Sequence, residues 1–179
     1  FVTTGGFHAV GLAAGMDALA VAAIQGAELA AQRVHRLLDG RFSGLADQLS
    51  PTGRGAGLIA VHKRTVGVVA ELRRLASPGS VGLADTSMGQ EDAMTFAFDV
   101  AERLRRVEEL AIDVVACELL AARQAWALRG GARPPGLRGV AEAVCSCAEP
   151  VTADRPLGAD IESLASLVRG GSLLEGPHR

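Results

Sequence analysis

Apolar residues return at helical spacing along the first part of the chain. Over residues 8–39 they recur roughly every three to five positions, which places them along one side of an α-helix, and Asp39-Gly40 provides a stop signal. A second helix is predicted over 57–76, where a Ser-Pro-Gly sequence ends it. Residues 92–129 predict the longest helix, which would extend about 55 Å at a rise of about 1.5 Å per residue. Because short connections between long helices favour antiparallel packing, we predict that it runs antiparallel to both earlier helices.

The helix predicted over 92–129 changes character along its length. Its first half carries charged side chains on one face, whereas Leu110 to Leu128 is apolar nearly all round. A helix that is apolar on every side has to be buried on every side, so we expect additional protein around this segment. Its few charged residues need buried ionic partners, partly from other chains, because an unpaired buried charge is strongly destabilising. These residues are Asp113, Glu118 and Arg123.

Two shorter helices complete the predicted fold. They cover 137–148 and 158–169 and follow a break that is rich in Gly and Pro. We therefore predict an all-α fold, a long antiparallel helix bundle. Its bundle segment is residues 1–130, and residues 131–179 form carboxy-terminal short helices that pack on the bundle.

The composition favours the same fold class. Hydrophobic residues make up 49% of the chain and aromatic residues only 3%, with no Tyr. Ala and Leu, which favour helices, lead the composition, while Val and Ile are scattered rather than run together. The formal net charge of −2 comes without a basic stripe, so the composition does not favour a nucleic-acid partner.

Residues 9–27 are apolar enough to suggest a membrane span, but they favour a buried bundle helix. They are mostly Ala and Gly. Asp17 lies mid-segment, and an Asp at the centre of a membrane-spanning helix costs about 3 kcal/mol of insertion free energy. Three cysteines do not suit a disulfide framework, and Cys145 and Cys147 lack a second ligand pair for a metal. We expect no membrane, no metal and a reducing, cytoplasmic compartment.

Residue spacing alone identifies no catalytic site. The four histidines are far apart, and none belongs to an H-x-x-x-H pair that would suit a metal. No Ser lies in a G-x-S-x-G setting, which would indicate a nucleophile. Residue spacing alone therefore predicts a helical domain and no particular function.

The segment 77–92, which we call the pocket loop, changes this interpretation. It reads Ser-Pro-Gly-Ser-Val-Gly-Leu-Ala-Asp-Thr-Ser-Met-Gly-Gln-Glu-Asp. It resembles a loop of the histidine and tyrosine ammonia-lyases, whose sequence is H-P-A-S-V-D-S-I-P-T-S-A-N-Q-E-D. The residues that match without a gap are Pro78, Ser80, Val81, Thr86, Ser87, Gln90, Glu91 and Asp92.

Further landmarks of the same family follow in the right order. The sequence Thr4-Gly-Gly-Phe-His-Ala resembles the family's G-G-N-F-H-A, and Asp17 falls at the Asp of its D-N-L-A. The sequence that begins at Glu118 resembles E-L-L-A-A-A-Q-A, and the one that begins at Asp154 resembles D-R-P-L-x-x-D-I-E. The chain is thus similar to the carboxy-terminal part of the aromatic amino acid and histidine ammonia-lyases.

The resemblance implies a specific chemistry that this chain does not hold by itself. The family's electrophile is a methylidene-imidazolone made from an internal Ala-Ser-Gly, and its base is a Tyr. This sequence contains neither Ala-Ser-Gly nor Tyr. The resemblance therefore implies that the methylidene-imidazolone comes from a partner chain.

For the chain's own residues, the resemblance implies Glu91 as a catalytic group and Gln90 and Phe7 as substrate-binding residues. A structural alternative is that Gln90, Glu91 and Asp92 simply cap the long helix. Departures from the family pattern point to an unusual substrate or a degenerate lineage. Gly6 and Gly89 replace Asn, and Ala93 replaces the His of histidine-specific members.

Three functions remain open. In the first, the chain is a subunit of a split aromatic amino acid ammonia-lyase or aminomutase, in a hetero- or homo-oligomer whose substrate is an amino acid as a small molecule. Alternatively, it is a fragment of a full-length lyase, or a non-catalytic scaffold homologue. A neighbouring reading frame with Ala-Ser-Gly would favour the first, an intact single frame the second, and neither the third.

Overall fold

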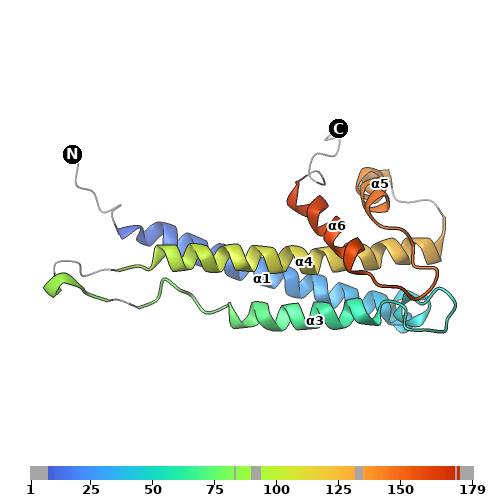
Figure 1. Ribbon diagram of the computed structural model, residues 1–179, viewed down its shortest axis with the longest axis horizontal. Coiled ribbons are helices and arrows are strands. Elements are labelled where there is room, and N and C mark those ends of the chain that lie inside the picture. The colour runs from blue at the N-terminus through green and yellow to red at the C-terminus, as the bar shows by residue number, and fades with distance from the viewer. Residues whose placement is uncertain (1–7, 83, 90–93, 132–134, 172, 174–179) are drawn as a thin grey trace.

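The computed structural model describes residues 8–82, 84–89, 94–131, 135–171 and 173. In this part of the chain the regular structure is helical and no β-strand is present. Three long helices form the bundle: α1 (Val10–Leu38), α3 (Ile59–Arg74) and α4 (Ala97–Arg129), which lie side by side in Figure 1. The all-α prediction is confirmed.

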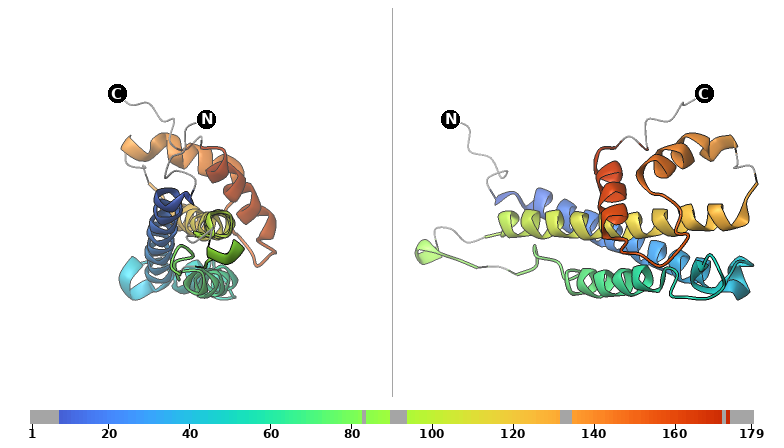
Figure 2. Two further views of the ribbon diagram at one scale, coloured as in Figure 1. Left: turned by 90° about the vertical axis from the view of Figure 1, so that its left-hand side faces the viewer. Right: turned by 45° about the vertical axis from the view of Figure 1, so that its right-hand side comes forward.

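Shorter helices lie between and after the long ones. They are α2 (Gly40–Ser43), η2 (Asp47–Leu49), η3 (Ser87–Gly89), η4 (Pro135–Leu137), α5 (Arg138–Cys147) and α6 (Gly158–Arg169). The views in Figures 1 and 2 place α5 and α6 on the side of α4 that faces away from α3. Helix α4 is thus enclosed from two sides by elements of its own chain.

The directions of the long helices differ from the prediction in one respect. Helix α3 runs antiparallel to α4, because Arg64 pairs with Asp113 while Arg106 pairs with Glu71. Helices α1 and α4 instead run parallel, since Arg33, late in α1, pairs with Glu118, late in α4. The predicted antiparallel arrangement of these two helices was wrong, because the chain reverses direction twice between them.

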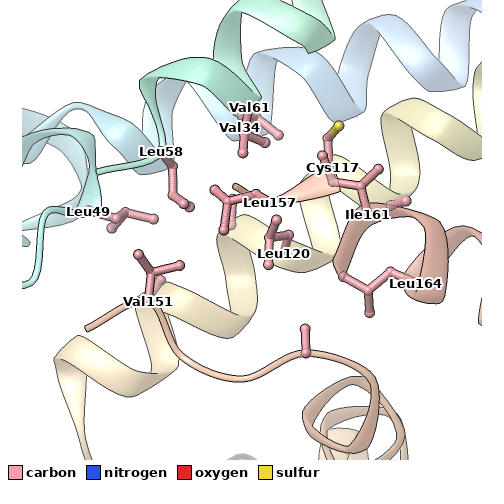
Figure 3. Close-up of a cluster of buried hydrophobic side chains, with 14 of the residues drawn as sticks. Val34, Leu49, Leu58, Val61, Cys117, Leu120, Val151, Leu157, Ile161 and Leu164 are labelled. Atoms are coloured by element: carbon pink, nitrogen blue, oxygen red, sulfur yellow. The ribbon is translucent and has the colours of Figure 1, made fainter. Parts of the chain in front are cut away.

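The second half of α4 packs against other helices of this chain and is partly buried. Leu120 and Cys117 lie in a cluster with Val34 of α1, Val61 of α3 and Leu164 of α6, which Figure 3 shows from one side. Burial raises the pKa of the Cys117 thiol to about 11, as expected for a thiol in apolar surroundings. Helices α1, α3, α5 and α6 pack around this segment. Several of its residues are only partly buried, so the need for other protein around it stays a prediction.

The charged residues of this segment also find partners in the same chain. Asp113 accepts hydrogen bonds from Arg64, with the shortest N–O distance 2.9 Å. Both carboxylate oxygens of Glu118 accept hydrogen bonds from the Arg33 guanidinium, one of them at 2.9 Å. The Nε of Arg123 donates to the carbonyl oxygen of Ala148 at 3.0 Å. All three thus have a partner within the chain, and a further contribution from other chains stays a prediction.

Helix α1 leaves more apolar surface uncovered than α4 does. By length and composition it is the one helix of the described residues that could cross a membrane, although only 28% of its most apolar window is buried. Val10, Leu12, Leu19 and Leu29 are exposed. The same helix carries Asp17, whose carboxylate is buried in the bundle.

Candidate functional site

The pocket loop lies in the connection between α3 and α4. In Figure 1 its described part extends past the amino-terminal end of α4, where the ribbon is light green. A short turn shapes it: the N–H of Gly89 donates to the carbonyl oxygen of Thr86 at 3.1 Å. Ser87 and Met88 have positive φ angles of 53° and 56°, which non-glycine residues rarely adopt. Residues 86–89 of the loop thus form a defined turn.

Asp17 of α1 holds the first residues of the pocket loop. Its side chain is buried, with 6% of the residue exposed. One carboxylate oxygen accepts the N–H of Gly79 at 3.2 Å. The other accepts the N–H and the hydroxyl of Ser80 at 2.9 and 2.5 Å. Both oxygens are therefore used to bind the loop.

Arg103 of α4 completes this arrangement. Its guanidinium pairs with Asp17 and donates to the carbonyl oxygens of Leu75 and Ser77, the latter at 2.9 Å. Burial raises the pKa of Asp17, but the hydrogen bonds from Ser80 and Gly79 and the charge of Arg103 outweigh it, so that the pKa lies below its usual value. Asp17 therefore stays ionised at neutral pH, as an acceptor of N–H groups should.

A second attachment lies at the other end of the connection. The hydroxyl of Thr95 donates to the carbonyl oxygen of His8, and the N–H of Met94 donates to the carbonyl oxygen of Ala84 at 3.3 Å. Thr95, which follows the Gln-Glu-Asp motif, thus contacts the residue just after Phe7. The sequence motif that contains Phe7 and the one that ends the pocket loop flank the same contact.

The predicted site residues Phe7, Gln90 and Glu91 all lie outside the described residues. Helix α4 begins at Ala97 rather than at Asp92 as predicted, because Phe96 has a left-handed φ of 49° in the N-cap position. The Gln-Glu-Asp motif therefore precedes the first turn of α4 by several residues.

A hollow lies near the other end of the bundle, around two histidines. The rings of His35 and His62 are 5.2 Å apart between centroids, beside a cavity of about 320 Å³ that Asp39 also lines. Burial and the charge of His35 lower the pKa of His62, and hydrogen bonds from Arg41 lower that of Asp39 to about 2. Sequence spacing gave no sign of this pair, since the residues belong to different helices.

No group of three potential metal ligands occurs among the residues that the structure describes. Of the four histidines, only His35 and His62 are brought together in this part of the chain. We therefore find no geometry for a metal centre in the described bundle.

Other motif residues of the resemblance have structural roles. The side chain of Gln124 bonds the backbone of Leu49 and Val151. Asp154 accepts the N–H groups of Ala56 and Gly57 at 3.1 and 3.2 Å. These contacts connect the loop before α3 to the segment before α6. Neither Gln124 nor Asp154 was predicted to have such a role.

Comparison with known proteins supports the resemblance. Residues 1–146 match the sequence profile described as aromatic amino acid lyase. The histidine ammonia-lyase of Symbiobacterium thermophilum is 34% identical over 175 residues, which are 97% of this chain and 34% of that protein. The chain thus spans about a third of the length of this relative.

Solved structures give the same result. The histidine ammonia-lyase of Trypanosoma cruzi superposes with a TM-score of 0.90 at 27% identity, over 97% of this chain and 35% of that one. The tyrosine aminomutase of Streptomyces globisporus superposes with a TM-score of 0.89 at 26% identity, over 96% and 34%. The order of motifs, the bundle and the sequence profile agree, and this chain belongs to the aromatic amino acid lyase family.

Proposed function

We propose that this chain supplies long bundle helices and one wall of the active site to an ammonia-lyase or aminomutase, as one subunit of a two-chain enzyme. The family match over residues 1–146 carries this proposal. The attachment of the pocket loop by Asp17 and Arg103 supports it, because a loop that contacts substrate has to be held rigidly.

The methylidene-imidazolone of the family would come from a partner chain. It requires Ala-Ser-Gly, and these 179 residues contain none. Where present, this group supplies the electrophile for the amine or ring of the amino acid. The residues of this chain fit the role of a wall beside such a group, since the pocket loop begins at a buried ion pair and carries the family's Gln-Glu motif.

Glu91 is the catalytic group that this chain would contribute. A carboxylate at that position can hydrogen-bond the substrate or exchange a proton with it. Gln90 would bind the substrate, and Phe7 would form an apolar wall. The contact between Thr95 and His8 supports a shared location, because it joins the two sequence segments next to these residues.

The substrate would be an aromatic or heteroaromatic amino acid. Relatives of the chain are a histidine ammonia-lyase and a tyrosine aminomutase. The Gln-Glu pair resembles the histidine and tyrosine members, while Ala93 replaces the His that follows it in histidine-specific members. This favours a substrate other than histidine, by elimination or by migration of the amine.

The charge of Glu91 provides the test. In the assembled enzyme, Glu91→Gln keeps the size of the side chain but removes its charge, so we expect kcat to fall by about 10²–10⁴-fold. Product formation from histidine, tyrosine and phenylalanine is followed by ultraviolet absorbance for elimination and by chromatography for amine migration. The control is Glu108→Gln, which removes the same charge from an exposed position of α4.

An unchanged kcat with a lower melting temperature would show that Glu91 is structural and would remove it from the site. The two-chain assignment has its own test, which is co-purification of a second polypeptide that carries Ala-Ser-Gly. A single polypeptide that carries both segments would place the electrophile on the same chain instead.

A further inference from the structure

We propose that Asp17 and Arg103 are positioning residues that fix the start of the pocket loop, residues 77–80, and through it affect the reaction of the assembled enzyme. The inference rests on the proposed function and adds two residues outside the motif that would touch substrate. We refer to the contacts of Asp17 and Arg103 with the loop as the clasp.

The clasp differs from every other cross-helix ion pair of the described residues by its burial. The Arg103 side chain is 13% exposed and that of Asp17 is 8% exposed. In the other pairs between long helices, the arginine side chains are 46% to 63% exposed. Exposed pairs contribute little to stability, whereas a buried pair has to satisfy nearly all of its polar atoms.

The side chains of the clasp also form hydrogen bonds with the backbone of the pocket loop and of the residues just before it. Asp17 binds the N–H groups of Gly79 and Ser80, and Arg103 binds the carbonyl oxygens of Leu75 and Ser77. These four contacts with backbone groups fix both the position and the direction of the chain as it leaves α3. The segment that leads to Gln90 therefore starts from a fixed point.

Helix packing alone does not account for this geometry. The Nε of Arg103 is buried without a hydrogen-bond partner among the described residues, and such an orphaned donor has a cost. An apolar pair would fill the same space without that cost. What an apolar pair cannot do is bind two N–H groups and two carbonyl oxygens of the loop, and this is the function that the geometry assigns to the clasp.

The effect on catalysis would pass through the loop. Displacement of a catalytic group by about 1 Å can lower the rate by about 100-fold. Asp17→Asn keeps the shape of the side chain but turns one acceptor into an NH₂ group that faces the N–H donors of the loop. Arg103→Lys keeps the charge but cannot reach three acceptors at once, because an ammonium lacks the fork of a guanidinium.

The experiment uses the assembled lyase that contains this chain. We expect Asp17→Asn and Arg103→Lys to lower kcat by about 10–100-fold, measured well below the melting temperature. Hydrogen exchange should become faster in peptides that cover 77–89 and remain unchanged in α3. Ser80→Ala removes a single hydrogen bond, so it tests the same loop in a protein that folds, and Ser80→Thr should restore kcat.

Asp113→Asn is the matched control. It breaks another ion pair of α4, with Arg64, that lies away from the pocket loop. A positioning role predicts that Asp113→Asn leaves both kcat and loop exchange unchanged at the same temperature. Equal losses of kcat in Asp113→Asn and Asp17→Asn would reduce the clasp to a general contribution to stability and overturn the proposal.

Glu91→Gln separates this inference from the proposed function. If Glu91→Gln lowers kcat while Asp17→Asn, Arg103→Lys and Ser80→Ala do not, the clasp is overturned and the proposed function stands. If none of these variants changes kcat, the pocket loop is not part of the active site and both proposals fail.

Discussion

Gln124 is a buried polar side chain of α4 that binds backbone groups on two other segments. The residue is 1% exposed. Its amide nitrogen donates to the carbonyl oxygens of Leu49 and Val151 at 3.2 and 3.0 Å, and its oxygen accepts the N–H of Val151 at 2.8 Å. One side chain of α4 thus satisfies three backbone groups of two different loops. Buried backbone groups require such partners.

We predict that Gln124→Leu lowers the free energy of unfolding by about 2–5 kcal/mol, because it leaves three buried backbone groups without partners. Urea unfolding of the assembled protein, followed by circular dichroism, measures the change. Gln32→Leu is the control, since Gln32 is exposed on α1, and it should alter the free energy by about 0.5 kcal/mol or less. Equal effects of the two substitutions would refute the role of Gln124.

Among the elements, α4 organises the fold. Its Leu110–Leu128 segment packs against α1 and α3 on one side and against α5 and α6 on the other. Leu120 lies at the centre of this junction and is 1% exposed. Helices of the same chain thus cover much of this apolar run, and they approach α4 from opposite sides.

Leu120→Ala should cost about 2–5 kcal/mol of unfolding free energy, because it opens a cavity where several elements meet. The same denaturant measurement applies. Leu137→Ala makes the identical chemical change at an exposed position outside α1, and its effect on the free energy of unfolding should be far smaller. A Leu120→Ala protein that unfolds like the unsubstituted one would contradict the packing described for α4.

At the scale of the whole molecule, α1 carries part of the exposed apolar surface. Leu12, Leu19 and Leu29 are exposed on a helix whose interior face is packed against α3 and α4. A Cβ added at Gly11 or Gly15 would meet no atom within 4 Å, so there is room for another helix to approach. Exposed apolar surface of this kind is typical of protein interfaces.

We expect the isolated chain not to be a stable monomer and to have no lyase activity. In the assembled protein, Leu19→Glu should weaken association, because it places a charge on apolar surface, while the helical content is retained. Sedimentation velocity measures the association state, and circular dichroism measures the helices. Gln25→Glu adds the same charge at an exposed polar position of α1 and should leave assembly unchanged.

A monomer of the isolated chain at micromolar concentration with cooperative unfolding would contradict this expectation. Product formation by the isolated chain would refute the need for a partner that carries Ala-Ser-Gly.

The sequence by itself determined the helices and the family. Helical periodicity is local, so 8–39, 57–76 and 158–169 predicted α1, α3 and α6 to within a few residues. The family followed from motifs in a fixed order, which need no coordinates. The start of α4 was missed because the left-handed backbone at Phe96 has no signature in the pattern of apolar residues.

Only the tertiary structure decided which residues meet across the chain. Asp17 and Arg103 are 86 positions apart, and Gln124 and Leu49 are 75 apart. Such contacts depend on the direction and rotation of each helix, and neither follows from the residues of one helix alone. The parallel course of α1 and α4 made Arg33 the partner of Glu118. The antiparallel course of α3 and α4 made Arg64 the partner of Asp113. The same arrangement brought Asp17 to the pocket loop, where a buried carboxylate binds the backbone that leads to the family's Gln-Glu motif.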